Sequence, residues 1–301
     1  MFQYYCLNPI SKVGLEKFSD SYTKTETAEE AEGILVRSAA MHDMEFSDKL
    51  LCVARAGAGV NNIPLDRCAE KGIVVFNTPG ANANGVKELV FAGMLLASRD
   101  IIGGINWVIS DKSDENIAKA AEKEKKKFAG TEIEGKKLGI IGLGAIGRKV
   151  ADIAKAFGVH VIYYSASGRP SQEGYEQVDL DTLLRTSDVI SVHAPLNEYT
   201  ENLMDKAAFA KMKKDAIFLN LGRGPIVVEE DLAEALKQGT IAAAGLDVLR
   251  TEPIQPDNPL LAIKDSHKLL ITPHIAWAST EARTRLMQIV LDHVKGFAEK
   301  R

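Results

Sequence analysis

The chain has 301 residues, which at about 150 residues per domain predicts two domains. Its composition, 46% hydrophobic and 26% charged, is that of a globular protein and excludes disorder over the whole chain. The formal net charge of −4 is too balanced to indicate a nucleic acid or an anionic membrane as a partner.

The sequence contains no predicted membrane span or signal peptide. The longest apolar stretch, Leu89–Ala97, is about half of the ~20 residues that cross a bilayer. Three cysteines, Cys6, Cys52 and Cys68, are odd in number and never form a CxxC pair, so we expect reduced thiols and no metal site. These features predict a cytoplasmic protein.

Short apolar runs alternate with amphipathic patterns along the chain. The strand candidates are, in chain order, Ile34–Arg37, Leu51–Arg55, Ile73–Asn77, Lys137–Gly142, Val159–Tyr164, Val189–His193, Ala216–Asn220, Ala242–Leu246 and Leu269–Thr272. The helix candidates are Val86–Ser98, Ile101–Ile109, Ile146–Phe157, Glu229–Gln238 and Thr280–Glu299. This alternation predicts an α/β protein with doubly wound parallel sheets.

The polar stretch Asp111–Lys127 interrupts the alternation and is predicted as a long exposed helix near a domain junction. Residues 99–275 contain a G-x-G-x-x-G pattern at Gly142–Gly147, and we expect them to form a dinucleotide-binding domain. Residues 1–98 and 276–301 would then form a discontinuous substrate-binding domain. Because the chain crosses between the domains twice, a hinged cleft is expected.

A glycine-rich turn follows the strand candidate Lys137–Gly142. Gly142, Gly144 and Gly147 form the pattern G-x-G-x-x-G between a strand and a helix start. Gly142 permits the tight turn, Gly144 lets the backbone approach a pyrophosphate, and Gly147 allows close packing of helix on strand. The N–H groups at Ala145 and Ile146 would face the phosphate at the helix N-terminus. The context predicts a dinucleotide site.

The end of the next strand determines which dinucleotide is preferred. An acidic residue commonly stands there and binds the ribose 2′-hydroxyl, but Ser165, Ser167 and Arg169 occur instead. Without a carboxylate a 2′-phosphate is not repelled, and these side chains can donate to it. We expect NAD or NADP as the cofactor, with a slight preference for NADP.

Four stretches in this order resemble the D-isomer-specific 2-hydroxyacid dehydrogenases over nearly the whole chain. They are Arg55–Ile63, Gly142–Gly147, Leu221–Val227, and the run from Gly245 through Glu252 to Trp277. The resemblance implies a Rossmann cofactor domain inserted in a flavodoxin-like substrate domain. It also implies hydride transfer between a nicotinamide cofactor and C2 of a small anionic hydroxy acid.

The family's catalytic arginine, glutamate and histidine map onto Arg223, Glu252 and His274. A histidine titrates near neutrality, so His274 can take the hydroxyl proton and return it in reduction. Glu252 beside it would orient the ring and favour the imidazolium. Arg223 offers a planar fork to the carboxylate and to the C2 oxygen.

The resemblance also places residues near the cofactor. Asp247 is implied to lie near the nicotinamide and to touch its carboxamide. His193 is implied to line the site through its backbone. Pro195 and Thr200, in the loop that follows, are expected to contact the cofactor as well.

The N-terminal part resembles the phosphoglycerate dehydrogenase branch. Arg37 and Arg55 would hold the phosphate and carboxylate of the substrate, with Ala56 and Gly57 beside them. Lys125 matches a basic residue that reaches the substrate of the neighbouring subunit. The first hypothesis is therefore oxidation of D-3-phosphoglycerate to 3-phosphohydroxypyruvate, in serine biosynthesis.

The C-terminal half instead resembles glycerate, hydroxypyruvate or glyoxylate reductases. Trp277 stands where phosphoglycerate dehydrogenases commonly have a small residue, and a large ring could fill the room that a phosphate needs. A glycerate/hydroxypyruvate or glyoxylate reductase is therefore the alternative. A nucleotide-sensing corepressor-like binding protein is a more remote one.

The resemblance further implies a homodimer. In relatives the nucleotide domains pair through the region that corresponds to Val86–Ser98 and Ile101–Ile109. The chain stops just after the last predicted helix, so control through an appended regulatory domain is not expected.

Overall fold

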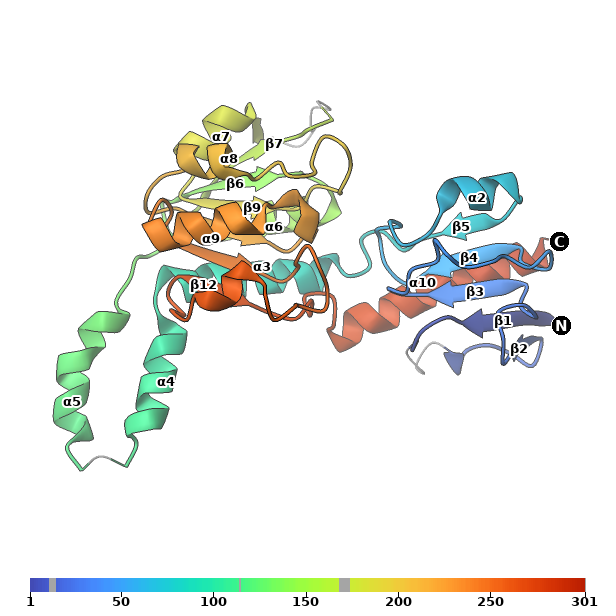
Figure 1. The fold of residues 1–301 in the computed structure, drawn as a ribbon, viewed down its shortest axis with the longest axis horizontal. Helices are drawn as coiled ribbons and strands as arrows, with labels where there is room; N and C mark the ends of the chain where they lie inside the picture. Colours follow the sequence, from blue (N-terminus) through green and yellow to red (C-terminus); the bar gives the residue numbers. More distant parts are fainter. Residues whose placement is uncertain (11–14, 114, 168–173, 301) are drawn as a thin grey trace. The chain divides into compact units, whose positions relative to one another are not determined.

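A computed structural model describes residues 1–10, 15–113, 115–167 and 174–300. The chain divides into two compact units (Figure 1). Unit 1 consists of Met1–Gly85 and Trp277–Arg301, and unit 2 of Val86–Ala276. Within the described ranges, none of the helices has the length and apolar character needed to cross a bilayer.

Unit 1 is built on a five-stranded parallel sheet in the order β2-β1-β3-β4-β5. Its strands are β1 (Phe2–Cys6), β2 (Tyr22–Lys24), β3 (Gly33–Val36), β4 (Cys52–Arg55) and β5 (Val74–Phe76). This is the flavodoxin-like order, in which the direction of strand addition reverses between β1 and β3. The described helices of this unit are α2 (Leu65–Glu70), which contacts β5, and α10 (Thr280–Glu299), which contacts β4.

The two faces of the unit 1 sheet are buried by alternate residues of its strands. Leu35 packs with Met287 and Val290 of α10, whereas Ile34 and Val36 belong to the cluster on the opposite face. Because side chains alternate along a strand, one continuous apolar run supplies both faces.

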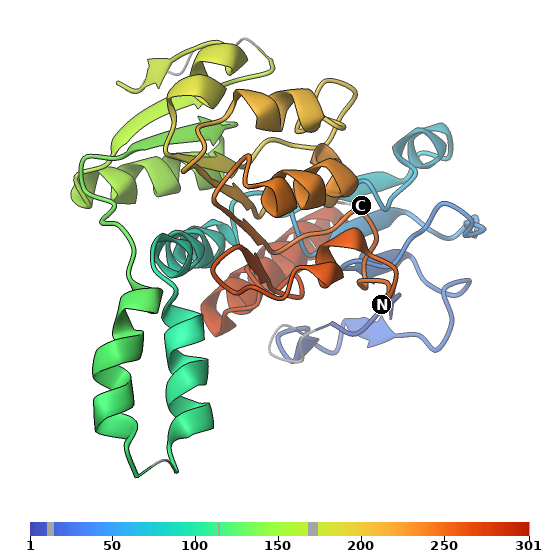
Figure 2. The same ribbon diagram turned by 60° about the vertical axis from the view of Figure 1, so that its left-hand side comes forward.

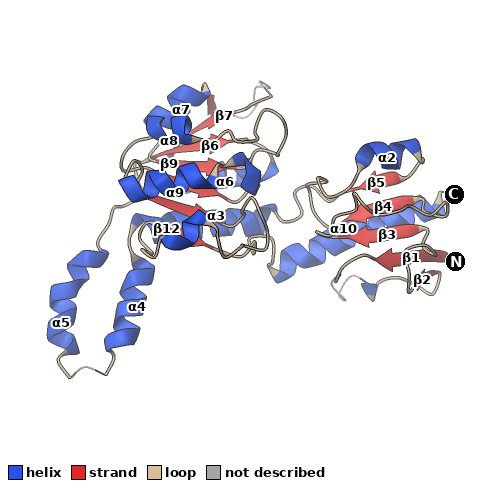
Figure 3. Cartoon of the chain, viewed as in Figure 1, coloured by secondary structure: helices blue, strands red, loops and turns tan. Residues whose placement is uncertain are grey.

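Unit 2 contains a seven-stranded parallel sheet in the order β12-β11-β10-β9-β6-β7-β8 (Figure 3). The strands are β6 (Lys137–Ile141), β7 (His160–Tyr164), β8 (Glu176–Gln177), β9 (Val189–Val192), β10 (Ile217–Asn220), β11 (Ala243–Leu246) and β12 (Leu269–Ile271). All of the pairs are parallel. This order is that of a Rossmann domain extended by β12, and its reversal point lies between β6 and β9. The predicted fold class is confirmed.

Helices cover both faces of the unit 2 sheet. The α-helices are α3 (Ala83–Ser98), α4 (Ile101–Asp111), α5 (Ile117–Glu124), α6 (Ala145–Ala156), α7 (Leu180–Thr186), α8 (Lys206–Lys211) and α9 (Glu229–Gln238). Short 3-10 turns are η1 (Lys125–Phe128), η2 (Gly224–Ile226) and η3 (Pro259–Ala262). Buried residues of α3 and α6 share one core cluster, and those of α7, α8 and α9 share another.

The first crossing between the units lies earlier in the chain than the expected boundary at 98/99. Most of α3 belongs to unit 2, which begins at Val86. Val90 and Met94 are fully buried in the same cluster as Leu138 and Ile140 of β6. Burying these side chains against β6 ties the helix to the nucleotide-binding sheet.

The single helix expected over Asp111–Lys127 is wrong. Instead α4 ends at Asp111 and α5 begins at Ile117, and the two lie side by side as an antiparallel hairpin (Figures 1 and 2). The apolar residues of α4 stop at Ile109, and the polar residues that follow offer no apolar face until Ile117. The residues after Ile109 therefore have no apolar side chains with which α4 could continue to pack, and the helix ends at Asp111.

Candidate active site

The glycine-rich turn connects β6 to α6 as predicted from its spacing. Gly142 has a φ of 96°, and a Cβ there would lie 2.6 Å from the backbone nitrogen of Ala194. A Cβ on Gly147 would lie 2.4 Å from the carbonyl oxygen of Gly142, so the helix packs closely on the strand end.

The N-terminus of α6 leaves room for a ligand. Gly144 is the N-cap, and no atom of the described residues lies within 4 Å of the position that its Cβ would take. The N–H groups of Ala145 and Ile146 begin the helix beside this space. Helix N–H groups and the helix dipole favour a phosphate at such a position. The residues present therefore fit the pyrophosphate of a dinucleotide.

The loop after β9 lies next to the glycine-rich turn, at the reversal point of the sheet. The Thr200 hydroxyl donates to the carbonyl of Pro195 at 2.6 Å and accepts from the N–H of Asn197 at 2.9 Å, which fixes this loop. The N–H of His193 donates to the carbonyl of Ile141 at 2.8 Å. Burial lowers the pKa of His193 to about 4, so its imidazole is neutral near pH 7.

The end of β7 borders a cavity. Tyr164 and Ser165 line it together with Asp179 and Thr182 from the start of α7. Ser165 Oγ lies 3.1 Å from Oγ of Ser167. Arg169, the third residue expected to meet a 2′-phosphate, lies outside the described residues.

Asp179 is an acidic residue of this cavity that sequence reasoning missed. Its two carboxylate oxygens accept from the N–H of Thr182 at 2.9 Å and from the Thr182 hydroxyl at 2.7 Å. These hydrogen bonds lower the pKa of Asp179, which is also the N-cap of α7. The pattern D-x-x-T before a helix was the signal that could have found it.

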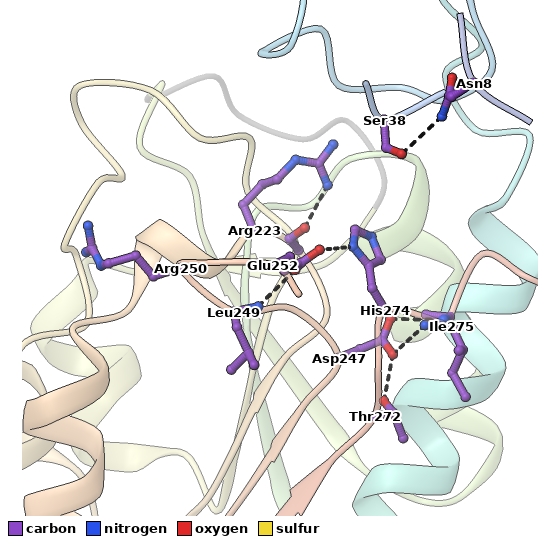
Figure 4. A network of polar contacts seen from close by, with 12 residues as sticks. Asn8, Ser38, Arg223, Asp247, Leu249, Arg250, Glu252, Thr272, His274 and Ile275 are labelled. Atoms are coloured by element: carbon purple, nitrogen blue, oxygen red, sulfur yellow. Dashed lines mark hydrogen bonds and ion pairs between the residues drawn. The ribbon is translucent and has the colours of Figure 1, made fainter. Parts of the chain in front are cut away.

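The three candidate catalytic residues come together at the carboxyl edge of the unit 2 sheet. Arg223 follows β10, and His274 follows β12. Glu252 lies on the loop that leaves β11, between these two strands in sequence. Figure 4 shows the three side chains converging. Ligands of open α/β sheets bind at this edge.

Glu252 and His274 are directly joined. Glu252 Oε2 lies 2.6 Å from His274 Nδ1, and Oε1 accepts from the N–H of Leu249 at 2.9 Å. Partial burial by itself raises the pKa of Glu252. The hydrogen bonds from His274 and Leu249 and the charges of His274 and Arg223 outweigh that effect, so its pKa lies below the ordinary value. Glu252 is therefore ionised at neutral pH.

Arg223 is half-buried and held by its own turn. Its Nη1 donates to the carbonyl of Gly222 at 2.7 Å, and its carbonyl accepts from the Asn220 side chain at 3.0 Å. Burial lowers the pKa of the guanidinium and the charge of Glu252 opposes that effect. The side chain stays protonated because the ordinary pKa of arginine lies far above neutrality.

Asp247 contacts the loop that carries His274. Its buried carboxylate accepts from the Thr272 hydroxyl at 2.6 Å, from Ile275 N–H at 2.8 Å and from Ala276 N–H at 2.9 Å. His274 has a φ of 54°, which is unusual for a residue other than glycine. Asp247 therefore helps to hold His274 in a strained conformation.

A second buried carboxylate joins the loops of Arg223 and Glu252. Glu229 accepts from the N–H of Arg250 at 2.5 Å and from the Asn258 side chain at 2.7 Å. A Cβ on Gly224 would lie 1.9 Å from the carbonyl oxygen of Leu249, so the two loops are in backbone contact. Sequence reasoning missed Glu229, because a glutamate in the first turn of a helix is ordinary.

The candidate substrate residues, apart from Lys125, lie at the carboxyl edge of the unit 1 sheet. Arg37 follows β3, Arg55 ends β4, and Ala56 and Gly57 come next. A Cβ on Gly57 would lie 1.8 Å from Nη1 of Arg55, so a side chain there would displace this guanidinium. Lys125 lies instead in η1 of unit 2 and forms an ion pair with Glu122 at 2.5 Å.

Among the residues that the structure describes, no group of three or more His, Cys, Asp and Glu side chains is arranged to hold a metal ion.

Comparisons with known proteins agree with this arrangement. A sequence profile of the D-isomer specific 2-hydroxyacid dehydrogenase NAD binding domain matches residues 91–276. D-3-phosphoglycerate dehydrogenase of Archaeoglobus fulgidus is 40% identical over 274 residues, which cover 89% of this chain and 50% of that protein. Hydroxypyruvate reductase of Blautia hydrogenotrophica is 36% identical over 312 aligned positions, covering 97% of this chain and 94% of that protein.

Among solved structures, the NADPH-dependent glyoxylate/hydroxypyruvate reductase of Sinorhizobium meliloti, in complex with NADP and malonate, superposes with a TM-score of 0.84 at 26% identity. The match covers 98% of this chain and 93% of that chain. The present chain spans about half the length of the phosphoglycerate dehydrogenases that it matches.

Proposed function

Because the chain belongs to the D-isomer specific 2-hydroxyacid dehydrogenase family, we propose that it oxidises D-3-phosphoglycerate to 3-phosphohydroxypyruvate, as in serine biosynthesis. The family and the relatives are NAD(P)-dependent 2-hydroxyacid dehydrogenases. The observation that carries the choice of substrate is the pair of arginines at one sheet edge. Arg37 directly follows β3 and Arg55 ends the neighbouring strand β4, so both residues lie at the carboxyl edge of the unit 1 sheet. Two guanidinium groups suit a substrate with a carboxylate and a phosphate.

The proton transfer at C2 is assigned to His274. Its Nδ1 faces Glu252, which directs the exchange with the substrate hydroxyl to Nε2. When bound, the nicotinamide ring accepts the hydride that leaves C2 and returns it in the reverse direction. Oxidation then sends the hydroxyl proton to His274 while the C2–O bond becomes a carbonyl.

Glu252 and Arg223 complete the chemistry. The ionised Glu252 stabilises the imidazolium that forms on His274 and fixes the ring plane. Arg223, with its guanidinium held by Gly222, binds the substrate carboxylate and faces the charge that develops on the C2 oxygen.

The cofactor would be held by the turn Gly142–Gly147 and the loop from His193 to Thr200. We propose a preference for NADP over NAD, because no carboxylate directly follows β7. Asp179 lines the same cavity, but its oxygens are engaged by Thr182. Ser165 and Ser167 supply hydroxyl donors there. Comparing catalytic efficiency with NADPH and NADH tests this preference, and at least tenfold better use of NADH would contradict it.

A second candidate is reduction of hydroxypyruvate or glyoxylate. Trp277 favours it, because its ring lies beside Arg37, with the Arg37 Cζ 5.0 Å from the ring centroid. The reductase of Blautia hydrogenotrophica also matches over almost its whole length.

Steady-state kinetics on both substrates distinguish the two candidates. We expect turnover of 3-phosphoglycerate, and Arg37→Ala is expected to abolish it while hydroxypyruvate reduction persists. A purified protein that reduces hydroxypyruvate but shows no detectable oxidation of phosphoglycerate would establish the second candidate instead.

We also propose that the chain forms a homodimer through the hairpin of α4 and α5. Ile105, Val108 and Ile109 of α4 are each more than half exposed. Such an apolar stripe on a protruding helix is typical of a protein interface. Lys125, at the end of the same hairpin, would then reach the substrate of the second copy. Sedimentation is expected to give twice the 32.7 kDa chain mass, and Ile105→Asp to give the monomer mass.

A further inference from the structure

The loop that follows β11 carries an arginine beside the candidate catalytic set. Arg250 lies two residues before Glu252, and its side chain points away from Glu252 and His274 (Figure 4). It therefore takes no direct part in the proton transfer assigned to His274. Its hydrogen bonds instead reach the loops that follow two other strands of unit 2, β9 and β10.

The backbone of Arg250 is anchored where its side chain begins. Its N–H donates to Oε1 of Glu229 at 2.5 Å, and Oε2 of Glu229 accepts from the Asn258 side chain at 2.7 Å. Glu229 is buried and begins α9. Hydrogen bonds to a buried carboxylate are strong, because the charge has lost its contact with water. The base of the Arg250 side chain is therefore fixed relative to the start of α9.

The Arg250 guanidinium contacts two loops at once. Its Nη2 donates to Oδ1 of Asn202, and it also reaches the carbonyl oxygens of Val227 at 3.4 Å and of Pro225 at 3.5 Å. Pro225 and Val227 lie at the end of η2, where a short helical turn leaves carbonyl groups for a cation. Asn202 lies two residues after Thr200, at the end of the loop that is proposed to hold the cofactor.

Asn202 is suited to this contact by its backbone. It has a φ of 55°, a left-handed conformation that asparagine adopts more readily than most residues. Its N–H donates to the carbonyl of Pro225 at 2.9 Å, and the N–H of Met204 donates to the carbonyl of Ile226 at 3.0 Å. Because these backbone bonds do not involve Arg250, removing the guanidinium should leave the loop folded while releasing the Asn202 side chain.

We propose that Arg250 is a positioning residue, which ties the loop His193–Thr200 to the loop of Arg223 through Asn202 and thereby raises the affinity for the cofactor. Exposed ion pairs contribute little, because two mobile side chains must both be ordered. Here the backbone of Arg250 is already fixed by Glu229, and the planar guanidinium loses little further freedom. The link to the cofactor rests on the proposed function, which assigns the loop His193–Thr200 to cofactor binding.

A double-mutant cycle on cofactor binding tests the contact. Arg250→Met keeps most of the aliphatic stem and removes the donors, whereas Asn202→Gly removes the acceptor and tolerates the left-handed backbone. We expect each variant to raise the Kd for NADPH, measured by the fluorescence of the reduced nicotinamide, by about fivefold or more. Because both changes break one contact, the double variant should bind about as weakly as Arg250→Met alone.

The matched control is Arg185→Met, which removes an exposed arginine of α7 that pairs with Asp181 at 2.7 Å. This control should bind NADPH as the parent does. A parent-like Kd in Arg250→Met, or effects of the two single variants that multiply in the double variant, would overturn the proposal.

Steady-state kinetics separate positioning from a loss of folded protein. We expect Arg250→Met to raise the KM for the cofactor by the same factor as the Kd, while the KM for the hydroxy or oxo acid stays within about twofold of the parent value. Partial unfolding would instead lower the apparent kcat and leave the KM for the cofactor unchanged.

The same measurements distinguish this proposal from the proposed function. If the parent oxidises 3-phosphoglycerate and Arg250→Met keeps the parent KM for the cofactor, the positioning role fails and the proposed function stands. If the parent binds NADPH but does not oxidise phosphoglycerate, the proposed substrate fails, whereas a raised Kd in Arg250→Met upholds the positioning role.

Discussion

The substitution Asp247→Asn tests whether a buried carboxylate holds the catalytic histidine in place. Asp247 accepts three hydrogen bonds, from the Thr272 hydroxyl and from the N–H groups of Ile275 and Ala276, at 2.6 to 2.9 Å. Asparagine has the same shape, but it has one acceptor oxygen, no charge and an amide NH₂. That NH₂ would face a donor wherever the second carboxylate oxygen now accepts.

The size of the effect follows from these contacts. Hydrogen bonds to a charged group contribute about 1.5–3 kcal/mol each, and an unsatisfied buried donor costs about 1–3 kcal/mol. We therefore expect Asp247→Asn to lower the free energy of unfolding by about 2–4 kcal/mol. His274, with its φ of 54°, would then relax out of position. A displacement of about 1 Å at a reacting group reduces kcat by roughly 100-fold.

Urea unfolding followed by circular dichroism measures the stability, and steady-state kinetics measure kcat and the KM for the cofactor. The control is Asp257→Asn, an exposed residue that shares the charge change. The positioning argument fails if Asp247→Asn keeps both stability and kcat close to those of the parent. If only the KM for the cofactor rises, Asp247 acts on the nicotinamide carboxamide, as the family resemblance implies.

Three further predictions concern residues around the site. Burial lowers the pKa of His193 from its ordinary 6.5 to about 4 in the folded chain. As the pH falls, the unfolded chain therefore takes up the proton before the folded chain does. The free energy of unfolding is expected to decrease as the pH drops from 6.5 to 4. His193→Asn is expected to remove about 2 kcal/mol of the loss between pH 7 and 5, measured by urea unfolding at both pH values. Glu229→Gln should reduce kcat by a larger factor than it changes KM, and it should lower the free energy of unfolding by about 1–3 kcal/mol. Glu230→Gln, the variant of the exposed neighbour, should leave both kcat and the free energy of unfolding unchanged. Ser165→Asp should reduce the efficiency with NADPH at least tenfold relative to NADH, and an unchanged ratio would show that the end of β7 does not meet the ribose.

The strands of unit 2 were predictable because of their burial. Every strand predicted from Lys137 onward occurs in the structure. The two-residue edge strand β8 is the one strand of this unit, among its described residues, that was not predicted. Each is a continuous apolar run, which is the pattern of a parallel strand covered on both faces. The strands β1 and β2 of unit 1 were not predicted. Tyr4 is the one buried residue of β1, and β2 lies exposed at the sheet edge, so neither carries a continuous apolar signal.

The candidate catalytic set was predicted from motif order, and the sheet explains why its members lie close together. Arg223 and His274 each follow a parallel strand, and parallel strands bring their carboxyl ends to one edge. Their approximate position is therefore fixed once the strands are recognised. Arg37 was named as a substrate residue, but the cavity that it lines together with Arg283 at the carboxyl edge of the unit 1 sheet was not foreseen. It depends on α10 returning to the sheet edge of unit 1 from the far end of the chain.

The orientation of the catalytic side chains was not predictable for a different reason. Asp247 is bound by the N–H groups of Ile275 and Ala276, and Glu252 by the N–H of Leu249. A backbone N–H is the same for every residue except proline, so these donors leave no trace in the choice of side chain. The sequence therefore identifies the carboxylate residues but does not identify the backbone groups that donate hydrogen bonds to them. Such contacts exclude only proline at the donor positions. In a single sequence, the lack of proline at a few positions cannot be distinguished from chance.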